Sequence, residues 1–190
     1  MRYLLMPFVD ILLLLFVVLG LFYGFFQGML KVGISILVFY LTIVLSSLYY
    51  RPLALAISKN STTPFQVLEM LSFLTLLFVL FFALLWVASY TFRYLKVGGQ
   101  LQYIDKVIGT FLGLILGAMI ASIFAMMLRY LFSTTAPAVL DYPAMRFLQA
   151  STRASALKNV FLDIILPLIY GPIRPIMPES ADALFRSIQR

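Results

Sequence analysis

Apolar residues form four long stretches, at about residues 8–28, 32–50, 68–92 and 105–130, and charged residues lie mainly between these stretches and near the end of the chain. A helix needs about 20 predominantly apolar residues to cross the hydrocarbon core of a bilayer. Tyrosine next to arginine, as in Tyr50-Arg51 and Arg129-Tyr130, is typical of the edge of a membrane span. The pattern predicts an all-α, polytopic membrane protein with four transmembrane helices, arranged as two hairpins, within residues 1–132.

The first two stretches are separated by very few residues. A single helix over residues 11–50 would be about 60 Å long at 1.5 Å per residue, twice the thickness of the hydrocarbon core. We therefore expect the chain to turn back between Gly24 and Gly33, where glycines permit the left-handed backbone of a tight turn.

Two ladders of small residues recur every four positions inside the first and fourth stretches: Gly20, Gly24 and Gly28, then Gly109, Gly113, Gly117 and Ala121. Small residues at this spacing let helix backbones approach closely in lipid. The ladders predict helix-packing faces, either between helices of one chain or between subunits.

Residues 133–190 are rich in proline and are expected to add short interfacial helices to the membrane domain. One helical face is predicted from Leu157, Val160, Phe161, Ile164 and Leu168. Pro167 should end this helix after a few turns. The helix is expected to lie either in the membrane interface or against the bundle, and a last short helix is predicted from Ser180.

Composition narrows the class of protein. The chain is 63% hydrophobic, with no cysteine or histidine and a net charge of +7 that is spread thinly, and its mean hydropathy is +1.05. The missing residue types exclude disulfides and remove the usual zinc ligands and general base. Without a basic block we expect no nucleic-acid partner. With no phosphate-binding loop, metal pattern or nucleophile–base pair, we expect no enzyme activity and no cofactor.

A few polar residues are candidates for function. Because the uncharged parts of the third and fourth helices start at Met70 and Val107, Asp10 is the only acid that we expect inside an apolar segment. Asp10 suits a first helical turn, and Asp105, followed by Lys106, suits the N-cap of the fourth helix. Both carboxylates have a structural alternative to a functional role.

Three hydroxyls of the second span, Ser35, Thr42 and Ser46, fall on one helical face. They either bond backbone or neighbouring helices or line a hydrated path.

The chain resembles the colicin V production family over about residues 8–132. The resemblance is carried by Asp10, by Gly24-Phe25-x-x-Gly28 at the first turn, and by Asp105-Lys106-x-x-Gly109 with Gly113 and Gly117. It implies four helices in the bacterial inner membrane and a link to colicin V secretion and envelope stress tolerance. Relatives with a protease domain after the fourth helix imply that both termini lie outside.

Two functions follow from these observations. The first is a non-enzymatic accessory in secretion or envelope homeostasis that acts in the bilayer through a homo-oligomer or other membrane proteins. The second is a small oligomeric channel or transporter whose path is lined by the second helix.

Overall fold

The computed structural model describes residues 7–59, 65–92, 101–134, 143–173 and 175, and these residues contain helices and no strand. The predicted helix from Ser180 lies outside the described residues. The elements are α1 (Phe8–Ser58), α2 (Phe65–Thr91), α3 (Leu101–Thr134), α4 (Pro143–Ala154), α5 (Leu157–Val160), the π-helix η2 (Phe161–Ile165) and α6 (Leu166–Ile173).

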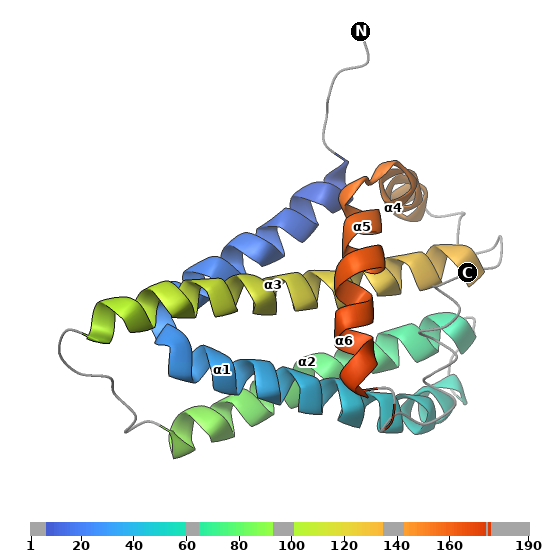
Figure 1. Ribbon diagram of the computed structural model, residues 1–190. Coiled ribbons are helices and arrows are strands. Elements are labelled where there is room, and N and C mark those ends of the chain that lie inside the picture. The colour runs from blue at the N-terminus through green and yellow to red at the C-terminus, as the bar shows by residue number, and fades with distance from the viewer. Residues whose placement is uncertain (1–6, 60–64, 93–100, 135–142, 174, 176–190) are drawn as a thin grey trace, which may run out of the picture.

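Helix α1 is broken at Gly28, whose φ of 77° and ψ of 172° are not helical. Gly28 is the one described residue with positive φ, in a region that is essentially restricted to glycine. We call residues 8–27 the N-terminal arm and residues 29–58 the C-terminal arm; Figure 1 shows them as the two sides of a V. The break predicted between Gly24 and Gly33 is therefore confirmed.

Among the described residues, three helices are long and apolar enough to cross a membrane: α1, Val67–Thr91 within α2, and Tyr103–Tyr130 within α3. Several predicted spans stop short of the helices that the structure shows. The C-terminal arm continues beyond Tyr50 to Ser58 with Pro52 inside it, because neighbouring groups in membrane proteins can satisfy the backbone that proline frees. Helix α3 begins at Leu101, ahead of the predicted position 105.

Helix α3 forms the centre of the bundle, with 67% of its most apolar window buried against 11% for α2. Figure 1 shows α3 running beside both arms of α1, with α2 alongside the C-terminal arm. Edge-to-face aromatic contacts join α1 to α2, with ring centroids 5.4 Å apart for Phe39 and Phe81 and 6.1 Å apart for Tyr50 and Phe73. Within the described residues, the face of α2 that points away from α1 and α3 has no comparable cover.

The segment α5–η2–α6 crosses α3 and the C-terminal arm (Figure 1). Its buried side chains are Phe161, Leu162, Leu166, Ile169 and Tyr170. The predicted face is wrong only in part: Phe161 is buried and Leu157 packs against the core, whereas Val160, Ile164 and Leu168 are exposed. The π-helix turn explains the exposure of Ile164 and Leu168, since its wider turn shifts those residues around the helix axis.

Pro167 does not end the helix as predicted, because α6 runs from Leu166 to Ile173. The π turn lies directly before Pro167, and π-bulges are one way in which a helix accommodates an irregular backbone. The segment from Leu157 to Ile173 therefore remains helical and covers the bundle as one piece.

Candidate functional site

The two glycine ladders face each other where the N-terminal arm crosses α3. A Cβ added to Gly24 would lie 2.9 Å from the Cα of Gly113, and one added to Gly20 would lie 2.7 Å from the Cα of Gly117. A Cβ added to Gly109 would lie 2.8 Å from the Cα of Gly28. Because these distances leave no room for a side chain, the two backbones are in direct contact. Ala121, one step further along α3, is fully buried.

A carboxylate from α3 caps the part of α1 that begins after the break. The backbone N–H of Met29, the first residue of the C-terminal arm, donates to Asp105 Oδ1 over 3.0 Å. A Cβ on Gly28 would collide with the same carboxylate. An anionic acceptor at a helix N-terminus satisfies a free N–H and complements the helix dipole. Asp105 therefore fixes the start of the C-terminal arm and holds it beside α3.

Asp105 is thus not the N-cap of its own helix, as the sequence had suggested. Helix α3 begins at Leu101, so Asp105 lies inside it and caps the start of another helix. Its neighbour Lys106 places its ammonium 5.6 Å from the centre of the Phe25 ring, within the range of a cation–π contact. Asp105 and Lys106 therefore both join α3 to α1 at the break.

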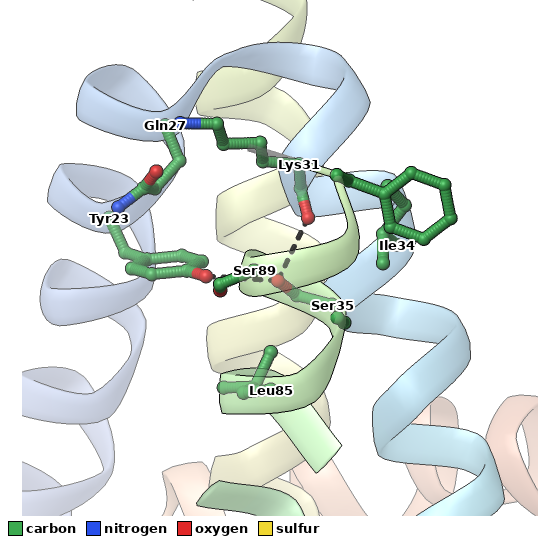
Figure 2. Close-up of a pocket in the computed structure, with 9 residues that line it drawn as sticks. Tyr23, Gln27, Lys31, Ile34, Ser35, Leu85 and Ser89 are labelled. Carbon is green, nitrogen blue, oxygen red and sulfur yellow. Dashed lines mark hydrogen bonds between the residues drawn. The ribbon is translucent and has the colours of Figure 1, made fainter. Parts of the chain in front are cut away.

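A cavity of about 280 Å³ lies next to the break, between the two arms of α1 and the end of α2. Figure 2 shows Lys31 extending from the C-terminal arm toward Gln27 on the N-terminal arm. Tyr23 Oη and Ser35 Oγ are hydrogen-bonded at 2.9 Å, and Ser35 donates to the Lys31 carbonyl at 2.9 Å. The complete lining is Tyr23, Gln27, Lys31, Ile34, Ser35, Leu85, Ala88, Ser89 and Phe92. The cavity therefore combines one cationic group and several neutral polar groups with an apolar wall.

Of the three hydroxyls suggested as a path, only Ser35 borders this cavity. Thr42 and Ser46 are fully buried. Thr42 donates to the Val38 carbonyl at 2.8 Å, which is the usual bond of a hydroxyl inside a helix. The burial of Thr42 and Ser46 does not favour a hydrated path along this face.

Asp10 is buried in the first turn of α1 and accepts a hydrogen bond from Ser155 Oγ. Ser155 lies between α4 and α5 and also accepts the Lys158 N–H over 3.1 Å. The Lys158 ammonium donates to the Thr152 carbonyl over 2.8 Å. Burial lowers the pKa of the Lys158 side chain below its usual value and the Arg129 charge lowers it further, while Asp10 acts in the opposite direction. Asp10 therefore anchors the C-terminal segment, residues 155–173, to the first turn of α1.

Asp10 is not the only acid inside an apolar segment, because Glu69 of α2 is also buried. Glu69 Oε1 lies 3.3 Å from Arg51 Nε of α1, and Glu69 Oε2 accepts the Tyr130 hydroxyl of α3 over 3.4 Å. The prediction began the uncharged part of the third helix at Met70 and so placed Glu69 outside it. The signal that the prediction missed was a single acid, Glu69, in the second turn of a long apolar helix.

No group of three acidic side chains that could hold a metal ion occurs in the described part of the chain. The described geometry instead consists of long apolar helices, backbone contact between glycines, polar groups that bond helices together, and one cavity at the turn. These features define an all-helical membrane protein.

The chain belongs to the family described as colicin V production protein, whose sequence profile matches residues 9–161. The match extends beyond the expected limit near residue 132 and reaches Phe161, so it includes α4, α5 and the first residue of η2. No curated protein and no solved structure matches the chain significantly.

Proposed function

We propose that this protein is a non-enzymatic accessory of the bacterial inner membrane that assists secretion or envelope homeostasis by binding membrane proteins. A second copy of the chain is the first partner in this proposal. The observation that carries it is the outer face of α2, where four aromatic side chains stand in one row. They are Phe78, Phe82, Trp86 and Tyr90, each more than half exposed.

Four membrane crossings underlie this proposal. The N-terminal arm is about 30 Å long at 1.5 Å per residue, which matches the hydrocarbon core. The Gly28 break lets the C-terminal arm return through the same membrane. With α2 and α3 this gives four crossings with both termini on one side, and the relatives that carry a protease domain after the fourth helix support an outside location for that side.

The row on α2 suits contact between membrane helices. Phe78 and Phe82 already pack against each other, with centroids 4.6 Å apart. Aromatic pairs are worth about 0.5–1.5 kcal/mol beyond their buried area. Because a two-fold dimer presents the same patch from both subunits, one apolar aromatic row can pair with its own copy without leaving a charge unpaired in lipid.

Photocrosslinking between two differently tagged copies tests the dimer. Trp86 is replaced by p-benzoylphenylalanine, and Ile123, which is buried in α3, is replaced in a control chain. We expect a crosslinked product that carries both tags from position 86 and none from position 123. In a separate test, changing Phe78 and Phe82 to leucine should reduce growth under envelope stress. Products with lipid alone at position 86 contradict the dimer, and unchanged growth contradicts the functional role of this face.

Topology is tested by labelling single cysteines, which is clean because the chain contains none. Cysteine replaces Arg2, Arg186 or Lys31 in separate variants. We expect a membrane-impermeant reagent to label the first two from outside and the third only after the inner face is opened. Labelling of Arg2→Cys and Arg186→Cys from opposite sides contradicts four crossings, and labelling of both from the cytoplasm contradicts only the orientation.

A further inference from the structure

The cavity beside the break has the chemistry of an anion site. Lys31 carries the only formal charge among its nine lining residues, and none of the nine is acidic. Asp105, the acid at the break, accepts a hydrogen bond from Met29 and does not line the cavity. The balance of charge inside the cavity is therefore positive.

Several lining groups remain available to a ligand. Tyr23, Ser35 and the Lys31 carbonyl bond one another. Among the residues that the structure describes, no hydrogen bond or ion pair occupies the Lys31 ammonium, the Gln27 amide or the Ser89 hydroxyl. All three side chains are exposed and line the cavity, so a ligand can reach them without breaking an existing contact.

The position of the cavity adds a second constraint. It lies at the end of the bundle where α1 turns and α2 finishes, with Ile34 and Leu85 on its wall (Figure 2). Phe92 also lines it. Ends of membrane helices meet the phosphate groups of lipids, and cationic side chains there attract anionic lipid. An apolar wall beside an ammonium suits a molecule that has a phosphate and an apolar part.

We propose that this cavity binds a phosphate group, held by an ion pair to the Lys31 ammonium and by hydrogen bonds from Gln27 and Ser89. A phosphate oxygen accepts charge-assisted hydrogen bonds from an ammonium more strongly than a neutral oxygen does. The phosphate belongs either to the headgroup of an anionic lipid or to a free phosphate. This proposal is tested independently of the proposed accessory role, because phosphate binding is measured on the purified protein.

Binding is measured by the shift in melting temperature of the full chain in neutral detergent, titrated with dihexanoyl phosphatidylglycerol, inorganic phosphate or dihexanoylglycerol. We expect saturable stabilisation by the phosphate-containing probes and none by dihexanoylglycerol. Stronger binding of phosphatidylglycerol identifies a lipid as the source, and equal binding of inorganic phosphate identifies a free phosphate. Both results support the phosphate site.

The decisive variant is Lys31→Met, which keeps the length of the side chain and removes its charge. Lys106→Met is the matched control, since Lys106 lies at the same end of the bundle on Phe25 and does not line the cavity. We expect Lys31→Met to weaken phosphate binding about tenfold or more, Ser89→Ala to weaken it less, and Lys106→Met to leave it unchanged. Equal losses from Lys31→Met and Lys106→Met, or equal binding of dihexanoylglycerol, would overturn the proposal.

Discussion

The carboxylate of Asp105 accepts the backbone N–H of Met29 over 3.0 Å, although the two residues are 76 positions apart. A helix that restarts after a break leaves its first N–H groups without partners. In this protein a different helix provides an acceptor for one of them. The bend in α1 is therefore fixed by α3 as well as by the backbone freedom of Gly28.

Replacing Asp105 with alanine should remove this cap and leave the Met29 N–H without its acceptor. N-cap substitutions of this kind cost about 0.5–2 kcal/mol, so we expect a clear fall in melting temperature. Asp105→Asn, which keeps an oxygen acceptor, should lose less. Asp163→Asn is the control, because Asp163 is exposed on η2. A melting temperature of Asp105→Ala equal to that of the control would refute the capping role.

The crossing of the N-terminal arm and α3 should not tolerate a larger residue at Gly113. Overpacking typically costs about 1–3 kcal/mol, and in Gly113→Leu the new side chain meets the backbone of Gly20 and Gly24. We expect loss of folded protein on size-exclusion chromatography in detergent. Gly33→Leu is the matched control, since an added Cβ there meets nothing within 4 Å. Normal folding of Gly113→Leu would mean that the two backbones are not in contact.

Glu69 and Arg51 should be energetically coupled, because one member of the pair is buried. The Glu69 side chain is 9% exposed and the Arg51 side chain is 55% exposed. Residues in contact show coupling energies of about 0.5–3 kcal/mol in double-mutant cycles. We expect the melting temperatures of Arg51→Met, Glu69→Gln and the double variant to show a combined loss smaller than the sum. Strict additivity would indicate that the pair does not form.

Ser155→Ala should loosen the C-terminal segment without unfolding the bundle. It removes the hydrogen bond to Asp10 and the acceptor of the Lys158 N–H. A hydrogen bond to a charged group is worth about 1.5–3 kcal/mol. We expect faster amide hydrogen exchange in α5–α6, with unchanged exchange in α3. Asn159→Ala is the control, because Asn159 is exposed on α5, and it should leave exchange unchanged in both regions. Unchanged exchange in Ser155→Ala would mean that apolar contacts alone hold the segment.

The hydroxyls of Ser35, Thr42 and Ser46 distinguish the accessory from the channel. Ser46 Oγ is buried without a hydrogen-bond partner within the described residues, so Ser46→Ala should leave stability unchanged or raise it, because an unsatisfied buried group is costly. The triple change to Ala, Val and Ala should give a folded protein that still complements an envelope-stress strain. A folded but inactive triple variant would favour the channel, since a dewetted path blocks conduction.

The helical class and the turn at Gly28 were predictable because each follows from local properties. Uncharged stretches of spanning length and one glycine-rich gap have few other solutions in a membrane. The role of Asp105 was not predictable in the same way. Its partner Met29 becomes visible only when α3 is placed against α1, so the residue type indicated a cap and left open which helix it would cap.

The same limit applies to the C-terminal segment and to the cavity. The predicted positions of Ile164 and Leu168 assumed a regular helix, but with the π turn of η2 Leu166 and Ile169 are buried in their place. The cavity joins residues from three helical segments, of which Lys31 and Gln27 were in the predicted turn and Ser89 was in a different helix. Such a site depends on packing distances that no local pattern contains.

The contact between Asp10 and Ser155 has a consequence for the order of events during synthesis. The two residues are 145 positions apart, so the ribosome delivers Asp10 to the membrane long before Ser155 has been made. An unpaired carboxylate is costly inside a bilayer, so until Ser155 has been made we expect Asp10 to stay in contact with water or lipid headgroups. Once Ser155 has been made, its hydroxyl can donate to Asp10. The first turn of α1 therefore reaches its final packing only after the residues around Ser155 have folded against it.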